Sequence, residues 1–256
     1  MIGALAGDMI GSIYEHHPIK RVAFPLFSPG SRFTDDTVLS LAVARAFLNS
    51  GEYGREMKTL GRRYPGAGYG TNFYQWLFEE QINPYHSWGN GAAMRVSPIG
   101  FGYDTEEEVL REARATAVVS HNHPEGVKGA QSVALAITLA RGGASKEAIR
   151  GRIQADFGYD LDRTVEEIRP GYRFDVSCQG SVPEAMVAFL DSSDYESAVR
   201  LAVSLGGDAD TQACIAGGIA EAYYGGVPAA IQREVKARLP VDLLEILEEF
   251  LARPPR

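Results

Sequence analysis

Apolar residues recur at helical spacing along almost the whole chain, and this pattern constrains the fold more than any other feature. Strict alternation of apolar and polar residues, which is typical of half-buried strands, is not convincing anywhere. The segments with helical spacing are 34–49, 105–120, 124–141, 145–155, 181–191, 194–205, 209–224, 227–238 and 240–252. The sequence therefore predicts an all-α protein, a compact multi-helix domain.

Local signals indicate where these helices begin and what lies between them. Asp194, and Ser181 followed by Pro183, are typical of helix starts, and paired glycines follow several segments as stops. Residues 50–90 and 157–180 contain many glycine, tyrosine, asparagine and proline residues, and we expect long loops around short helices there. Ordered loops of this kind in a helical domain often carry a functional site.

The composition is that of one globular domain, and we expect residues 1–256 to form it. A net charge of −8 argues against nucleic acid or an anionic membrane as the main partner. Two cysteines are too few for a disulfide framework, and the N-terminus lacks the basic start of a signal peptide. No stretch is apolar for the roughly 18 residues that a spanning helix needs. We therefore expect a cytoplasmic protein.

Two helix starts carry clusters of carboxylates and hydroxyls. They are Thr34, Asp35 and Asp36 in the stretch FTDDT, and Asp208, Asp210 and Thr211 in the stretch GGDADTQ. Residues two apart on a regular helix point in different directions, so Asp208 and Asp210 converge only if Asp208 precedes the helix. The glycines at 206 and 207 permit such an irregular turn.

Each cluster alone fits helix capping with a favourable helix-dipole interaction. Both together favour a metal site, because four carboxylates that meet at apolar helices without a cation would repel one another. Carboxylates and hydroxyls without cysteine or histidine suit Mg²⁺, Mn²⁺ or Ca²⁺ rather than zinc. This interpretation requires folding to bring the two helix starts together.

The N-terminal stretch GALAGDMIGSIYE, residues 3–15, presents small residues that another backbone can approach closely. Asp8 lies among these small residues. Glu15 stands at the end of the stretch, where the residues alone predict an exposed carboxylate.

Several other features fit two interpretations each. The stretch SWGNGA at 87–92 fits either a loop whose amides approach an anion or a plain helix-entry turn. Arg95 fits either a phosphate contact or an ion pair with an acidic helix. The stretch HNHP at 121–124 is a weak zinc signal, and a helix start at Asn122 is favoured over it. The aromatic-rich segment 64–78 fits core packing, with the wall of a cleft as the alternative.

These stretches together resemble the ADP-ribosylglycohydrolase family, which includes dinitrogenase-reductase-activating and ADP-ribosylhydrolase enzymes. The matching stretches, in the same order, are GALAGDMIGSIYE (3–15), FTDDT (33–37), WGNGAAMR (88–95), SH (120–121), SVPEAMVAFL (181–190) and GGDADTQACIAGGIAEAYYG (206–225). The resemblance implies an all-α fold with a two-metal centre that holds two Mg²⁺ ions, for which Mn²⁺ can substitute.

The resemblance also implies roles for individual residues. The implied metal ligands are Glu15, Thr34, Asp35, Asp36, Asp208, Asp210 and Thr211, with Asp210 bridging the ions. The implied substrate contacts are Asp35, Ser87, Trp88, Gly89, Asn90, Gly91 and His121, the last on the adenosine side. Glu15 is implied to be a mobile ligand near the scissile bond, and Glu15 or Asp36 is the implied catalytic acid or base.

The implied reaction is hydrolysis of the glycosidic bond at ribose C1″ of ADP-ribose linked to a side chain or a small acceptor. Such a cleavage passes through an oxocarbenium-like centre and releases ADP-ribose. The expected partners are ADP-ribose or an ADP-ribosylated protein, and we expect a monomer. Two alternatives stay open: a metal-dependent phosphohydrolase acting on a nucleotide diphosphate, and a non-catalytic ADP-ribose-binding protein of the same fold.

Overall fold

The computed structural model describes residues 1–49, 51–81 and 83–253, and in these ranges helices account for all the regular structure beyond an isolated bridge between Gly89 and Ser177. The helices are α1 (Ile2–Gly11), α2 (Asp35–Leu48), α3 (Tyr53–Arg63), α4 (Thr71–Phe78), α5 (Gly91–Met94), α6 (Ser97–Gly102), α7 (Glu106–Val118), α8 (Pro124–Arg141), α9 (Lys146–Phe157), α10 (Val165–Ile168), α11 (Cys178–Leu190), α12 (Tyr195–Ser204), α13 (Ala209–Tyr223), α14 (Ala229–Arg238) and α15 (Val241–Ala252). The all-α prediction is confirmed. No helix in the described ranges is long and apolar enough to cross a membrane.

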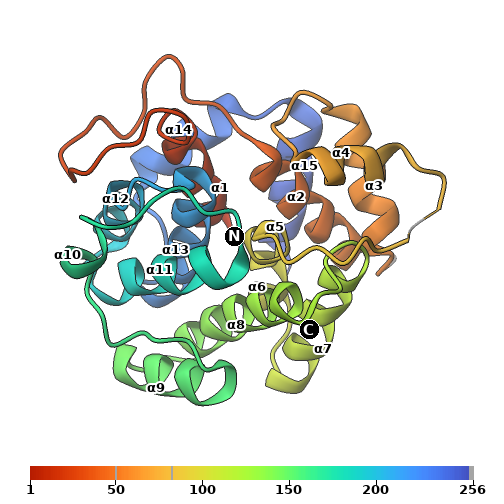
Figure 1. Ribbon diagram of the computed structural model, residues 1–256. Coiled ribbons are helices and arrows are strands. Elements are labelled where there is room, and N and C mark those ends of the chain that lie inside the picture. Colours follow the sequence, from red (N-terminus) through yellow and green to blue (C-terminus); the bar gives the residue numbers. More distant parts are fainter. Residues whose placement is uncertain (50, 82, 254–256) are drawn as a thin grey trace.

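The first helix packs against a helix from the last quarter of the chain, and Figure 1 shows the red α1 beside the blue C-terminal helices. A Cβ atom at Gly7 would lie 2.0 Å from the carbonyl oxygen of Ala213, and one at Gly11 would lie 2.5 Å from the Cα of Asp210. The backbones of α1 and α13 therefore touch, as the small residues of the N-terminal stretch predict. This contact fixes the start of α13 next to the end of α1.

Helix starts agree with local signals in some places and depart from them in others. Asp194 caps α12 as predicted, and its carboxylate accepts a hydrogen bond from the backbone of Ser197 at 2.7 Å. The predicted start at Ser181 is wrong, because Ser177 caps α11 four residues earlier. The Ser181 hydroxyl instead donates to the Ser177 carbonyl at 2.6 Å, and Pro183 lies inside the helix.

Candidate metal centre and substrate cleft

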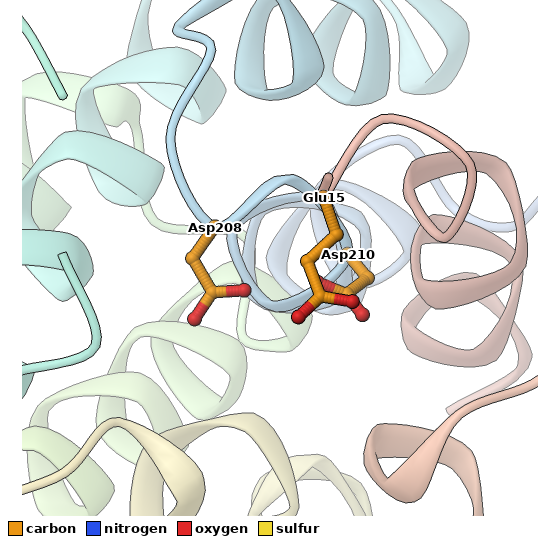
Figure 2. A group of neighbouring side chains, drawn as sticks. All are labelled: Glu15, Asp208 and Asp210. Atoms are coloured by element: carbon orange, nitrogen blue, oxygen red, sulfur yellow. The ribbon is translucent and has the colours of Figure 1, made fainter. Parts of the chain in front are cut away.

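Three acidic side chains from distant parts of the chain meet in one place. Glu15 lies in the loop after α1, whereas Asp208 and Asp210 stand at the start of α13. One carboxylate oxygen of each lies within 4.8 Å of one oxygen of each of the other two, and Figure 2 shows the carboxylates close together. Asp208 precedes the helix as predicted, because Gly206 turns the chain with a φ of +65°.

The acidic cluster at the start of α2 joins the one at the start of α13. The Thr211 hydroxyl donates to Oδ2 of Asp36 at 3.4 Å, although the two residues are 175 positions apart in the sequence. Asn90 holds the other side of the group, since its amide donates to Oδ2 of Asp208 at 2.7 Å. The structure thus meets the requirement that folding bring the two helix starts together.

The start of α2 is held in place by Asp8, a residue for which the sequence alone predicts no role. The buried Asp8 carboxylate accepts hydrogen bonds from the backbone and hydroxyl of Thr34, at 3.0 and 2.7 Å. It also accepts two from the backbone and hydroxyl of Thr37, at 3.1 and 2.5 Å. Burial raises the pKa of Asp8 to about 6 against the opposing effect of these bonds. Asp8 therefore connects α1 to the start of α2, where Asp35 and Asp36 lie.

Thr34 has a capping role as well as a place in the cluster. It is the N-cap of α2, and its hydroxyl oxygen accepts from the backbone of Asp36 at 3.3 Å. The same hydroxyl donates to Asp8. Capping and the acidic cluster are therefore built from the same short stretch of chain.

Burial raises the pKa of the carboxyls in this group, and for Asp35, Asp36 and Asp210 the charges of neighbouring carboxylates raise it further. The pKa values of Asp35 and Asp36 lie well above the ordinary value, first because both groups are buried and then because Asp8 is close. For Asp210 the cause is burial, followed by the charges of Asp208 and Asp36. The metal-free group therefore resists full ionisation.

The residues present fit a divalent cation. Oδ1 of Asp36 is buried and has no hydrogen-bond partner among the described residues. The nearest ion pair within the described part of the chain joins Glu15 to His16 at 3.6 Å, and His16 is largely exposed. Buried carboxylates without a basic partner gain most from a metal, and an all-oxygen donor set suits Mg²⁺ or Mn²⁺.

A cleft of about 550 Å³ opens beside the acidic group. All the residues predicted to contact substrate line it: Asp35, Ser87, Trp88, Gly89, Asn90, Gly91 and His121. The predicted ligands Glu15, Asp35, Asp36, Asp208, Asp210 and Thr211 line it as well. Thr34 does not, because it lies buried with its hydroxyl on Asp8.

Backbone hydrogen bonds hold the 87–91 loop in place. The backbone N–H of Asn90 donates to the Val176 carbonyl at 2.7 Å, and the backbone N–H of Gly89 donates to the Ser87 hydroxyl at 3.1 Å. Asn90 is also the N-cap residue of α5, so the helix-entry turn is confirmed. These two N–H groups therefore have partners within the protein and are not available to an anion. Gly91 instead leaves room for His121, whose Nε2 would lie 3.2 Å from an added Cβ.

His121 faces the cleft as a neutral ring. Burial lowers its pKa well below the ordinary value, and the charge of Arg95 lowers it further. Its Nδ1 lies 2.8 Å from the Ser120 hydroxyl. Arg95 is buried and donates to the Thr116 carbonyl and to the Ser120 hydroxyl, at 2.9 and 3.0 Å. These contacts differ from the ion pair with an acidic helix that was one of its two sequence interpretations, and Arg95 also lines the cleft.

The histidine-rich stretch begins a helix, but not at the predicted residue. His123 caps α8, because its Nδ1 accepts from the Glu125 backbone at 3.1 Å, and Pro124 is the first helical residue. Asn122 instead accepts from the backbone of His86 at 2.9 Å. The preference for a helix start over a zinc site is supported, with the cap moved by one residue.

Several cleft residues were not singled out by the sequence analysis. Phe174 and Val176 line the cleft with side chains that are 51% and 45% exposed, beside the expected contact residue Trp88, which is 47% exposed. Large apolar side chains left exposed around a cleft are typical of a ligand site. The glycine- and tyrosine-rich loops that carry them were the available signal. Phe73, from the aromatic-rich segment 64–78, also lines the cleft.

Comparison with known proteins gives consistent results. The family model described as ADP-ribosylglycohydrolase matches residues 1–255. The chain is 29% identical to ADP-ribosylhydrolase ARH3 of Mus musculus, over 95% of this chain and 88% of that protein. It is 26% identical to ADP-ribosylarginine hydrolase Tri1 of Pseudomonas putida, over 88% of this chain and 69% of that protein. A solved structure named ADP-ribosylglycohydrolase-related protein complex aligns with a TM-score of 0.73 and 27% identity, covering 97% of this chain and 95% of that one.

Proposed function

Because this chain belongs to the ADP-ribosylglycohydrolase family, we propose that it is a Mg²⁺-dependent hydrolase of the bond at ribose C1″ of attached ADP-ribose. The observation that carries the proposal is the meeting of Glu15, Asp36 and Asp208 at one cleft, from three separate parts of the chain. The acceptor is a side chain or a small molecule. The names of two relatives, an ADP-ribosylhydrolase and an ADP-ribosylarginine hydrolase, support the substrate class.

The proposed cofactor is a pair of Mg²⁺ ions, with Mn²⁺ as a substitute. The ligands would come from Glu15, Thr34, Asp35, Asp36, Asp208, Asp210 and Thr211. Such ions lower the pKa of a water molecule and orient sugar hydroxyls when bound. The all-oxygen donor set and the partnerless oxygen of Asp36 support this assignment.

Glu15 is the residue best placed for proton transfer. Its side chain is 24% exposed and lines the cleft, so it reaches both a ligand and solvent. Burial raises its pKa, and the charge of Asp208 raises it further. A carboxyl with a raised pKa can give a proton to a leaving group or take one from water near neutral pH. Asp36 is the second candidate for this role.

The rest of the cleft suits a nucleotide diphosphate sugar. Its volume of about 550 Å³ is in the range of small-molecule sites. The exposed rings of Trp88 and Phe174 offer flat apolar surfaces for a base. The neutral ring of His121 offers a hydrogen bond rather than a charge. Asn90, held by Asp208, connects this part of the cleft to the acidic group.

The test is to identify the product released from arginine-linked, serine-linked and acetyl-linked ADP-ribose. Each substrate is assayed with Mg²⁺, Mn²⁺ and a chelator, by chromatography and mass spectrometry. Intact ADP-ribose is the expected product, and the chelator should abolish its release. Glu15→Gln should lower the single-turnover rate by about 10²- to 10⁴-fold, the usual contribution of a positioned acid or base.

Four outcomes would contradict parts of the proposal. Release of AMP would indicate the phosphohydrolase instead. Tight binding of ADP-ribose with no turnover of any substrate would indicate a binding protein. Hydrolysis that is unchanged by the chelator would exclude the metal mechanism, and an unchanged rate in both Glu15→Gln and Asp36→Asn would show that neither is the acid or base.

A further inference from the structure

The loop that carries Glu15 runs from residue 12 to residue 34, between α1 and α2, and is here named the Glu15 loop. Its last residue, Thr34, is held by Asp8, and Ser12 near its start accepts a hydrogen bond from the backbone of Arg32 at 3.2 Å. These contacts close the base of the loop. Two cationic side chains, Lys20 and Arg200, make hydrogen bonds between the middle of the loop and the rest of the molecule, in addition to the apolar contacts of Phe24 and Phe27.

Lys20 reaches from the Glu15 loop to two other segments of the chain. Its ammonium donates to the carbonyl of Tyr172 at 2.8 Å and also to the carbonyl of Leu205. Tyr172 begins the stretch that carries Phe174 and Val176 along the cleft. Leu205 is the C-cap of α12 and stands three residues before Asp208. One ammonium group therefore joins three of the segments that build the site.

The turn between Leu205 and Asp208 packs closely against these partners. A Cβ at Gly206 would lie 2.9 Å from the Ile19 carbonyl oxygen and 2.9 Å from Cε of Lys20. A Cβ at Gly207 would lie 2.3 Å from the Tyr172 ring. The glycines allow the Glu15 loop and the Tyr172 segment to rest directly on the turn that presents Asp208.

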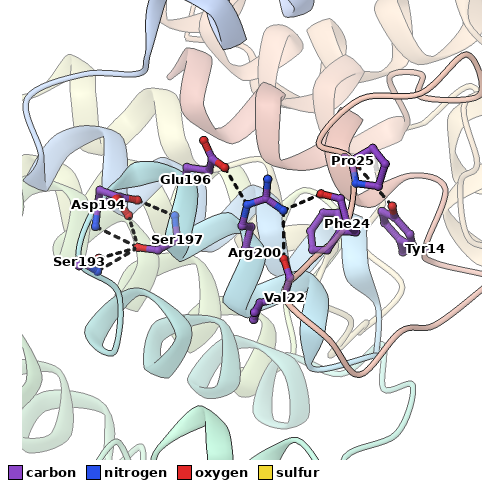
Figure 3. Close-up of polar contacts among 9 residues, drawn as sticks. All are labelled: Tyr14, Val22, Phe24, Pro25, Ser193, Asp194, Glu196, Ser197 and Arg200. Atoms are coloured by element: carbon purple, nitrogen blue, oxygen red, sulfur yellow. Dashed lines mark hydrogen bonds and ion pairs between the residues drawn. The ribbon is translucent and has the colours of Figure 1, made fainter.

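Arg200 provides a second attachment on the same helix, as Figure 3 shows. Its guanidinium donates to the carbonyls of Val22 and Phe24, at 3.0 and 2.6 Å, and lies 5.0 Å from the centre of the Phe24 ring. Glu196 orients the guanidinium through a bond of 2.8 Å. Since Arg200 and Leu205 sit at the middle and the end of α12, this helix holds the Glu15 loop at two points.

We propose that Lys20 is a positioning residue for the metal centre. Its ammonium fixes the Glu15 loop on the turn before Asp208, and this fixes the separation between the carboxylates of Glu15 and Asp208. Lys20 does not line the cleft, so it acts through the backbone rather than on substrate. The inference rests on the proposed function, because it assumes the proposed metal ions. The experiment that tests it measures metal binding separately from hydrolysis.

The experiment measures Mn²⁺ binding by electron paramagnetic resonance, with the metal alone, in the full chain and its variants. Lys20→Met should weaken Mn²⁺ binding by about tenfold or more, as loss of groups that orient ligands commonly does. Lys20→Arg keeps a donor for both carbonyls and should restore most of the affinity. Lys146→Met is the matched control, because Lys146 also donates to two carbonyls at a helix end, those of Leu190 and Ser192, away from the cleft.

The control should lose thermal stability without any change in Mn²⁺ affinity. Wild-type affinity in Lys20→Met would overturn the proposal, as would an equal loss of affinity in Lys146→Met. If Lys20→Met aggregates, Mn²⁺ affinity is measured in Lys20→Ala instead. A wild type that binds no Mn²⁺ would also overturn it. A wild type that binds Mn²⁺ in a Lys20-dependent way but releases no ADP-ribose would refute only the proposed function.

Discussion

At the scale of single residues, the acidic group opposes folding, because it gathers buried carboxylates that lack basic partners. Asp36 is buried, and its Oδ1 has no hydrogen-bond partner among the described residues. Its Oδ2 accepts a long bond of 3.4 Å from the Thr211 hydroxyl, whereas the Thr34 hydroxyl at the same distance gives its proton to Asp8. Groups of this kind are retained for function, since a buried charge without compensation opposes folding. The same side chains would favour the folded state if the proposed cation were bound to them.

Asp36→Asn should therefore stabilise the protein in the presence of a chelator. At neutral pH we expect a gain on the order of 1–3 kcal/mol in the free energy of unfolding, the usual penalty for an unsatisfied buried group. The pKa of Asp36 is raised on folding, so its contribution to stability is greatest below the unfolded value and is lost as the pH rises through the folded value. The advantage of the variant should thus shrink towards about pH 4. Urea unfolding curves across this pH range measure it.

Addition of Mg²⁺ provides the control for this prediction. The wild type should gain stability from the metal and the variant should gain much less, so the order of the two proteins should reverse. A variant that is less stable than the wild type in chelator at neutral pH would show that the Asp36 carboxylate is compensated in a way the structure does not reveal. An advantage that is independent of pH would exclude charge as its cause.

Residue types and spacing pointed to the two acidic clusters, and the family resemblance supplied the other cleft residues, but neither indicated the residue that supports them. Asp35, Asp36 and Asp210 stand out in sequence because carboxylates cluster at helix starts. Asp8 does not, because its role depends on hydrogen bonds to residues 26 and 29 positions away. His123 was missed as a cap for a similar reason: its neighbour Asn122 is the better capping residue, but is already engaged by His86.

At the scale of helices, long elements were predictable and short ones were not. The long helices α8 and α13 follow from their own apolar spacing, since burial of one face decides them. The four-residue helices α5 and α10 depend on tertiary contacts, because an isolated turn is not stable. The start of α11 was misplaced because proline is usual in a first turn, yet Pro183 is tolerated further inside this helix.

Gly7→Ala tests the contact between α1 and α13. The added methyl group would meet backbone atoms of Ala213 at 2.0 and 2.3 Å, which cannot move without separating the helices. We expect a loss of about 3 kcal/mol in the free energy of unfolding, at the upper end for overpacking. Gly151→Ala in α9 is the control, since nothing lies within 4 Å of its added Cβ, and it should gain up to about 1 kcal/mol.

The two glycine variants are compared by thermal and urea unfolding. If Gly7→Ala were as stable as the wild type, α1 would not rest on α13 at the distance found here. Metal affinity should fall together with stability in this variant, because α1 carries Asp8 and leads into Glu15. Gly151→Ala should leave metal affinity unchanged.

At the scale of the whole molecule, the site joins parts of the chain that the sequence keeps far apart. Residue spacing predicted helices, ligand types and loops, but the meeting of Asp36 with Thr211 depends on how the helices pack. Local pattern does not encode that packing, because many arrangements bury the same apolar faces. The resemblance of several motifs, in the same order, to a known family indicated this packing, because members of a family share the arrangement of their helices as well as their motif residues.

This arrangement predicts that the chain unfolds as one unit, as expected for a single domain. The two tryptophans, Trp76 and Trp88, lie in the middle of the chain, whereas the acidic group joins its beginning to its end. Hydrogen bonds join the segment around the tryptophans to two other parts of the molecule. Lys58 of α3 donates to the Trp76 carbonyl, and Asn90 donates to Asp208 at the start of α13. Tryptophan fluorescence and far-ultraviolet circular dichroism should therefore give coincident urea transitions, and Mg²⁺ should shift both by the same amount. A fluorescence transition that comes first and ignores Mg²⁺ would instead make the region around the tryptophans a separate folding unit, and the cleft would then lie at a boundary rather than inside one domain.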